Sequence, residues 1–188
     1  QKVEFVFKNI MPSSFAKSNI GTFTKEMIAG SYFCRIQDIE DYSDYHIKKF
    51  EDLLESTKRA RQLFKKYSFL IGYSNYTFEV WIIAHKAQVK SVANRSQYYT
   101  QINKAYNKSF ISNDDYKHKK NFESVLKMLS LDDVIKNALP ECVRFRNVNY
   151  ENNKNLIQSK YGFGYIKSDP DTTLDDFIKI VLKNAGLL

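Results

Sequence analysis

The sequence predicts an α/β protein with a doubly wound, mainly parallel sheet and a helical C-terminal extension. Short apolar runs that are typical of buried strands alternate with longer segments in which apolar residues recur every three or four positions. Parallel strands need crossover helices between them, so this alternation favours a parallel sheet. Beyond residue 95 the apolar spacing is helical. We therefore expect an α/β core over residues 1–95 and a helical extension over residues 96–188 that packs on it.

The predicted core consists of strands and helices in strict alternation, beginning with a strand. These elements cover residues 3–7, 22–29, 31–37, 44–66, 69–73 and 78–86. Thr22 or Thr24 can cap the first helix, because a side-chain oxygen there accepts a hydrogen bond from a free backbone N–H group. Ser74 or Thr77 can cap the last one in the same way.

The second half of the chain predicts further helices, at residues 97–106, 119–129, 131–139, 143–159 and 174–185. The last helix follows Asp169-Pro170-Asp171-Thr172-Thr173, which predicts a turn and a helix cap. Gly162 and Gly164 form only a G-x-G pair, which lacks the third glycine of a dinucleotide-binding loop. No nucleotide site is therefore predicted there.

Composition and charge limit the classes of function. The chain has 188 residues, of which 43% are hydrophobic, and it contains only two cysteines, without the spacing of a zinc site. No apolar run approaches the roughly 20 residues of a membrane helix. We expect a soluble, cytoplasmic protein with no membrane partner. Because the sequence begins with Gln1, we also expect that processing or a missing upstream segment has removed the original start.

The chain is basic and rich in aromatic residues. Its formal charge is +8, and it has 13 Tyr and 14 Phe. Lysine and arginine bind phosphates and aromatic rings stack on bases, so nucleic acid is a predicted partner. A simple bias toward Lys, Asn and Tyr would give the same composition.

Acidic residues cluster where the strand at residues 31–37 ends. Asp38, Glu40 and Asp41 would lie at the C-terminal edge of a parallel sheet, which is where ligands gather in such folds. Carboxylate oxygens are the ligands that Mg²⁺ prefers. A solvated acidic turn before a helix is the alternative interpretation, since the helix dipole also favours negative charge there.

A second acid occurs in a strongly apolar segment. Glu79 lies two residues before Trp81, the single tryptophan of the chain. A carboxylate among apolar neighbours needs a partner or a bound ion, although a glutamate in the first turn of its own helix is an equally simple reading. His85 is six residues further along, and a lone histidine is more often a structural hydrogen-bonding group than a ligand.

Basic residues in the second half could bind phosphates. The candidates are Lys117, Lys119, Lys120, Arg144 and Arg146. Ordinary surface cations at a helix start explain them equally well. Nucleophilic catalysis has no support, because there is no G-x-S-x-G motif and neither cysteine has a catalytic signature.

The stretch from Ser74 and Asn75 through Phe78, Glu79 and Trp81 to His85 resembles the signature of RloB-like proteins, which include abortive-infection proteins of the AbiLii type. The resemblance covers roughly residues 31–182. It extends upstream to Asp38 and downstream to the D-P-D-T-T stretch. It implies a TOPRIM-like fold, the catalytic module of topoisomerases and primases, and a role in bacterial defence against phage.

By this resemblance, Asp38 and Glu40 correspond to the Mg²⁺-binding D-x-D acids, with Asp41 as an alternative ligand, and Glu79 is the family's glutamate. Mn²⁺ is an alternative cofactor, and an ATPase is an implied partner. The sequence departs from the pattern in two ways. The second acid is Glu40 rather than Asp, and no E-G-x-x-T-E stretch, which carries the family's general acid or base, follows the first predicted strand.

The leading expectation is thus an anti-phage, Mg²⁺-dependent TOPRIM-like nuclease. Asp38, Glu40 and Glu79 would form its catalytic set, supported by the motif residues Ser74, Asn75, Trp81 and His85. The alternative is a non-catalytic nucleic-acid-binding or scaffold subunit of a defence complex. The missing general acid or base is worth about 10²–10⁴-fold in rate, so it bears on the activity more than on the fold.

Overall fold

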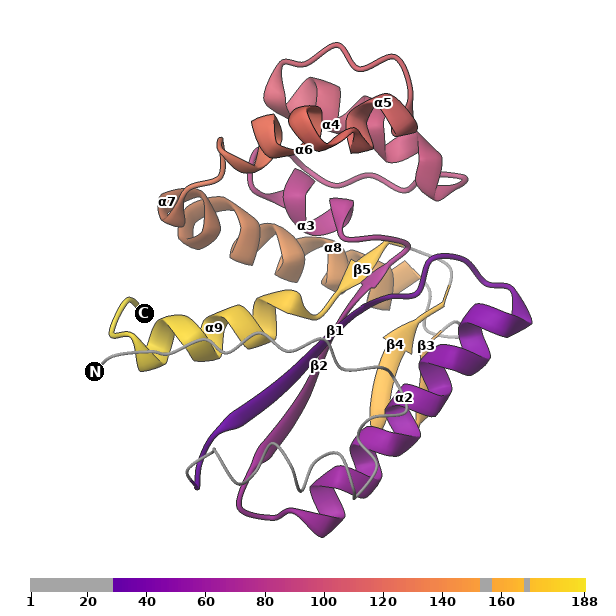
Figure 1. Cartoon of the computed structure of the whole chain (residues 1–188), viewed down its shortest axis with the longest axis vertical. Coiled ribbons are helices and arrows are strands. Elements are labelled where there is room, and N and C mark those ends of the chain that lie inside the picture. Colours follow the sequence, from indigo (N-terminus) through magenta and orange to yellow (C-terminus); the bar gives the residue numbers. More distant parts are fainter. Residues whose placement is uncertain (1–28, 153–156, 168–169) are drawn as a thin grey trace.

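The computed structural model describes residues 29–152, 157–167 and 170–188 (Figure 1). Within these residues the protein is a mixed α/β fold with a small mixed sheet and surrounding helices. The α/β class predicted from the sequence is therefore confirmed. The strand expected at residues 3–7 and nearly all of the helix expected at 22–29 lie outside the described residues.

Two parallel strands and the helix between them form the centre of the sheet. Strand β1 (Tyr32–Asp38) pairs with β2 (Ser68–Asn75) in a register that aligns Asp38 with Ser74. Helix α2 (Asp44–Leu63) makes the crossover, and the Ser43 side chain caps it by accepting a hydrogen bond from a backbone N–H. These elements lie within a few residues of their predicted bounds.

The third strand of this sheet comes from the end of the chain. Strand β5 (Asp171–Thr172) pairs antiparallel with β2, opposite Ser74 and Asn75. The sequence predicted only a turn here, because two residues are too few to show the alternation of a strand. The sheet order in the described residues is β1-β2-β5, so β2 lies between a parallel and an antiparallel neighbour.

Helices cover both faces of the strand pair. Phe69 and Tyr73 of β2 belong to a cluster that includes Phe50 of α2, hereafter the sheet core. Its buried members are Phe33, Ile39, Phe50, Leu53, Leu54, Ala60, Phe69, Tyr73 and Tyr165. Successive side chains of a strand point to opposite faces, and Gly72 accordingly faces the other way, toward Leu174 of α9 (Leu174–Asn184). Figure 1 shows α9 and α2 on either side of β1 and β2.

A β-hairpin replaces part of a predicted helix. The helix expected at residues 143–159 ends earlier, as α8 (Leu139–Asn152), and strands β3 (Ile157–Lys160) and β4 (Phe163–Ile166) follow. Tyr161 and Gly162 connect the strands and both have positive φ, which is the backbone of a two-residue hairpin turn. The sequence prediction was wrong here because Tyr-Gly is a weaker turn signal than Asn-Gly.

The remaining elements form a helical layer at one end of the molecule (Figure 1). They are α3 (Glu79–Ala84), a 3₁₀ turn (Arg95–Gln97), α4 (Tyr98–Tyr106), α5 (Asn113–Lys117), α6 (Lys119–Leu126), α7 (Leu131–Asp133), a π-helical turn (Val134–Ala138) and α8. Their apolar side chains form a second cluster, hereafter the helical core, whose largest buried members include Trp81, Tyr98, Tyr106, Tyr116 and Phe145. No helix in the described part of the chain has the length and apolarity needed to cross a membrane.

Candidate functional site

The segments that follow β1 and β2 lie side by side. The N–H of Ile39 donates to the carbonyl oxygen of Ser74 at 3.0 Å, and the N–H of Glu40 donates to that of Tyr76 at 2.9 Å. These two hydrogen bonds extend the parallel pairing past Asp38, the last residue of β1. Asp38 is thereby held next to the chain that leads into α3.

Glu79, the first residue of α3, lies on the second segment, within electrostatic reach of Asp38. Its side chain is buried, with the residue only 6% exposed. The Thr77 hydroxyl donates a hydrogen bond to Glu79 Oε2, and Lys117 Nζ of α5 lies 3.8 Å from Glu79 Oε1. The expectation that this carboxylate needs partners is confirmed.

The electrostatics of Asp38 show how closely the two acids interact. Burial raises the pKa of Asp38 from 3.8 to about 6, and the negative charge of Glu79 adds to the rise. The N–H of Phe78, which donates a hydrogen bond to the carboxyl group, and the charge of Lys117 act in the opposite direction. Two like charges are held together here with one half-exposed cation as counterion.

Glu40 and Asp41 are occupied elsewhere. Glu40 Oε2 accepts a hydrogen bond from Arg95 Nη1 at 2.8 Å and lies 3.6 Å from His46 Nε2. Asp41 Oδ1 lies 2.7 Å from His46 Nδ1 and accepts from the Ser43 N–H at 2.9 Å. Hydrogen bonds from Ser43 and His46 lower the pKa of Asp41. Asp41 thus has the surroundings expected of an acidic turn before a helix.

The donor set suits a hard cation, although it is sparse. Among the described residues, no group of three or more His, Cys, Asp and Glu side chains converges in a way that could hold a metal. Mg²⁺ is usually bound through one or two carboxylates and several waters, so Asp38 and Glu79 are chemically sufficient. The two carboxylates repel each other, and a divalent cation bound between them would relieve that repulsion.

The motif residues around Glu79 are buried and hydrogen-bonded. Ser74 Oγ lies 3.2 Å from Thr172 Oγ1, and Asn75 Nδ2 donates to the Ile166 carbonyl oxygen at 2.6 Å. These contacts tie the end of β2 to β5 and β4.

Trp81 and His85 form one unit on α3. His85 Nδ1 donates to the Trp81 carbonyl oxygen at 2.8 Å, and the two rings meet edge to face with centroids 4.9 Å apart. Burial lowers the pKa of His85, so the imidazole stays neutral at neutral pH. The two side chains thus stabilise the helix that begins with Glu79.

The predicted phosphate-binding residues separate into two groups. Lys117, Lys119 and Lys120 are exposed where α5 meets α6, and Lys117 lies beside Glu79. Arg144 binds the neighbouring Glu141 through both Nε and Nη2 at 2.6 Å. Of these residues, Lys117 is the one with a contact to the candidate site.

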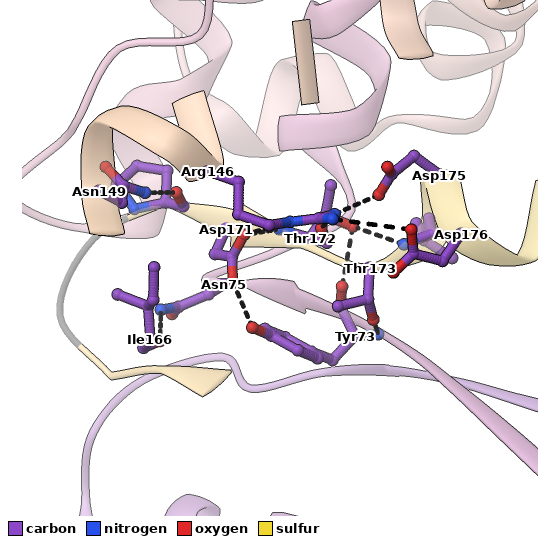
Figure 2. A network of polar contacts seen from close by, with 12 residues as sticks. Tyr73, Asn75, Arg146, Asn149, Ile166, Asp171, Thr172, Thr173, Asp175 and Asp176 are labelled. Carbon is purple, nitrogen blue, oxygen red and sulfur yellow. Dashed lines mark hydrogen bonds and ion pairs between the residues drawn. The ribbon is translucent and has the colours of Figure 1, made fainter. Parts of the chain in front are cut away.

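Arg146 lies in a buried network that the sequence did not reveal (Figure 2). Its guanidinium donates to Asp175 Oδ1 and to the carbonyl oxygen of Thr172. Asp171 and Asp176 each have an oxygen 3.6 Å from a guanidinium nitrogen. With only 18% of its side chain exposed, Arg146 joins α8 to β5 and α9 and is not placed to bind nucleic acid. Its partners lie 25–30 positions away, and no local spacing signals them.

The comparison with known families is decisive for membership. The model of the family described as RloB-like protein matches residues 30–181, which include β1, the acid pair and α9 up to Val181. The chain belongs to the RloB-like family. The match agrees closely with the range of the resemblance seen in the sequence. Searches of curated proteins and of solved structures found no match to this RloB-like chain.

Proposed function

We propose that this RloB-like protein is an anti-phage defence nuclease of the cytoplasm, with a TOPRIM-like core that uses Mg²⁺ or Mn²⁺ to hydrolyse phosphodiesters. One observation supports the proposal above all. Asp38 at the end of a parallel strand and Glu79 at the start of the helix after the next strand are brought together, although 40 positions separate them in the sequence. Burial of two like charges near each other lowers the stability of the fold, and such arrangements are common at functional sites.

Each side chain of the pair has a distinct role in this proposal. Asp38 would hold the metal with its carboxylate, to which the Phe78 N–H donates a hydrogen bond. Glu79 would be the second ligand, and its carboxylate accepts a hydrogen bond from Thr77. A bound divalent cation would polarise the scissile phosphate and lower the pKa of an attacking water. Glu40 follows Asp38 by two residues and accepts a hydrogen bond from Arg95, which it would have to exchange for the metal to act as a further ligand.

The nucleic acid would enter across the exposed lysines. Lys117 lies beside Glu79, and Lys119 and Lys120 follow it in the chain and are exposed, so a phosphate bound to Lys117 would be next to the metal. The overall charge of +8 favours a polyanionic substrate of any sequence. By analogy with its family, the protein would act beside an ATPase partner.

Metal binding and cleavage test the assignment separately. We expect Mn²⁺ titration to show one weak site in the wild type that Asp38→Asn and Glu79→Gln remove. Cleavage of plasmid DNA or single-stranded RNA should fall at least about 100-fold, because even outer-shell partners of a metal are worth about 10–100-fold. Asp52→Asn, an exposed acid of α2, is the matched control. Metal-dependent cleavage that survives Asp38→Asn would refute the site.

A scaffold role within a defence complex is the second candidate. The observation in its favour is that Glu40 and Asp41, two of the predicted ligands, already form ion pairs with Arg95 and His46. A chain without the full acid set can bind nucleic acid and cleave poorly. Complete absence of Mn²⁺ binding, together with intact salt-dependent binding of DNA or RNA, would favour this role.

A further inference from the structure

Two buried tyrosines in the helical core have hydroxyl groups without a partner. Tyr98, the first residue of α4, and Tyr116 of α5 are both 0% exposed. Neither phenol oxygen makes a hydrogen bond in the described part of the chain. A buried polar group that loses its bonds to water and gains none is strongly unfavourable, so such groups are rare in folded proteins.

Both tyrosines belong to the same core as α3, the helix that begins with Glu79. Tyr116 directly precedes Lys117, whose Nζ is 3.8 Å from Glu79 Oε1. Helix α4, which begins with Tyr98, packs on α3, which begins with Glu79. Burial raises the pKa of both tyrosines far above its ordinary value, and the negative charge of Glu79 adds to the rise in each. The phenols are therefore permanent hydrogen-bond donors within electrostatic reach of one carboxylate.

A third tyrosine of the same core behaves differently. Tyr106 is 2% exposed, and its hydroxyl donates to the carbonyl oxygen of Ile82 at 2.6 Å. Burial in this core is thus compatible with a satisfied hydroxyl. Among these three tyrosines, the unpartnered hydroxyls are those of Tyr98 and Tyr116, and the charge of Glu79 contributes to the raised pKa of both.

We propose that a buried water molecule accepts hydrogen bonds from Tyr98 and Tyr116 and donates one to the carboxylate of Glu79. Internal waters typically make about three hydrogen bonds to groups that would otherwise be unsatisfied, which is the number offered here. Glu79 keeps acceptor capacity for it, because a carboxylate has about four lone-pair sites and the known partners are Thr77 and Lys117. The two tyrosines are then positioning residues that orient the Glu79 carboxylate through this water.

A consequence for metal binding follows, and it rests on the proposed function. If Glu79 binds a cation, its orientation depends on Tyr98 and Tyr116. Tyr98→Phe and Tyr116→Phe should weaken Mn²⁺ affinity by about 10-fold, the usual effect of removing a group behind a metal ligand. Tyr106→Phe should leave the affinity unchanged, because its hydroxyl bonds to the backbone elsewhere.

The water itself is tested without metal or substrate. Tyr98→Phe and Tyr116→Phe are each made in the wild type and in a Glu79→Met background, and Tm is measured by circular dichroism. We expect each to lower Tm by about 2–4 °C in the wild type, the shift for one lost hydrogen bond in a chain of this size. In the Glu79→Met background the same changes should leave Tm unchanged or raise it. If Glu79→Met does not fold, Glu79→Gln replaces it, and the coupling should shrink.

Tyr106→Phe is the matched control, with an equal loss of Tm in both backgrounds. The proposal is overturned if Tyr98→Phe and Tyr116→Phe raise Tm in the wild type, because the hydroxyls are then truly without partners. It is also overturned if the loss is the same in both backgrounds, because the partner then lies elsewhere. If the tyrosine changes lower Tm more in the wild type than in the Glu79→Met background but no Mn²⁺ binds, only the nuclease proposal is rejected. If Mn²⁺ binds but the two backgrounds lose the same Tm, only the water is rejected.

Discussion

Two acidic clusters flank the same residue of β2 and are built in opposite ways. Ser74 pairs with Asp38 of β1 on one side and with Thr172 of β5 on the other. On the β5 side, Asp171 of β5 and Asp175 and Asp176 of α9 form ion pairs with the guanidinium of Arg146. On the β1 side, Asp38 meets another carboxylate, and one half-exposed lysine is the nearby cation.

The two clusters differ in how the negative charge of their aspartates is balanced. Burial raises the pKa of both Asp38 and Asp171 to about 6. For Asp171, the Tyr73 hydroxyl, Arg146 and a backbone N–H oppose the rise, and the charge of Asp175 adds to it. For Asp38, the charge of Glu79 adds to the rise, and the Phe78 N–H and Lys117 oppose it. The cluster around Asp171, hereafter the saturated cluster, thus contains a largely buried arginine, whereas the cluster of Asp38 and Glu79, hereafter the open cluster, has the half-exposed Lys117.

Removal of Arg146 should break the saturated cluster. Within the described residues, Arg146→Met leaves the fully buried Asp175 with Lys179 as its one cation and leaves Asp171 without an ion pair. We expect a loss of about 3–5 kcal/mol in the free energy of unfolding, the usual cost of leaving a buried charge without its partner. Urea denaturation measures it.

Arg59→Met is the control for this loss. Arg59 forms an exposed i,i+4 pair with Glu55, with 69% of its side chain accessible, so we expect about 0.5 kcal/mol or less. A similar small effect for Arg146→Met would show that the buried network contributes little beyond its hydrophobic surroundings.

Neutralisation of Asp38 should have the opposite sign. Since the pKa of Asp38 is about 6 in the folded protein and 3.8 ordinarily, the folded state binds more protons between these values. Stability therefore falls as pH rises through that window, by up to about 3 kcal/mol for a shift of this size. Asp38→Asn, which can keep the hydrogen bond from Phe78, should be as stable as the wild type at pH 4 and about 2–3 kcal/mol more stable at pH 7.5.

Urea denaturation at the two pH values measures this difference. Asp171 titrates in the same window in both proteins, so its contribution cancels. Asp52→Asn should show no such dependence, because Asp52 is exposed. If Asp38→Asn is less stable at pH 7.5, the ionised carboxylate is stabilising and the pair does not need a cation.

The two parallel strands and the helix between them were the elements that the sequence predicted well. The β1, α2 and β2 segments follow from apolar runs and helical spacing, because local sequence sets their faces. The hairpin and β5 did not follow, since a Tyr-Gly turn and a two-residue strand have almost no periodicity. Arg146 was assigned to phosphate binding because its buried partners come from another part of the chain.

The candidate site was predictable only in part, and for the same reason. Asp38 follows from its place at a strand end and Glu79 from its apolar neighbours. The proximity of these two acids depends on how the two segments pair, which local sequence does not show. Glu40 and Asp41 have the same local signal as Asp38, but their side chains contact Arg95 and His46.

Removal of one hydrogen-bond donor tests how much the Tyr73 hydroxyl stabilises Asp171. The Tyr73 hydroxyl donates to Asp171 within the saturated cluster. Tyr73→Phe should cost about 1.5 kcal/mol of unfolding free energy, because hydrogen bonds to charged groups are stronger than neutral ones. Tyr165→Phe, in the same core, is the control: its hydroxyl is 3.5 Å from Glu51, so its loss should be clearly smaller. Equal losses would mean that Arg146 alone satisfies Asp171.

The smallest effect on stability should come from the cation of the open cluster. Lys117 and Lys160 are matched lysines, with 47% and 45% of their side chains accessible, and each pairs with one glutamate. Both Lys→Met changes should cost less than about 1 kcal/mol. Only Lys117→Met should weaken DNA or RNA binding and reduce the salt slope by about one, because Lys117 stands beside the acid pair and can turn to a phosphate. Fluorescence anisotropy over a salt series measures both quantities, and an equal change in Lys160→Met would mean that the whole basic surface, rather than this site, holds the nucleic acid.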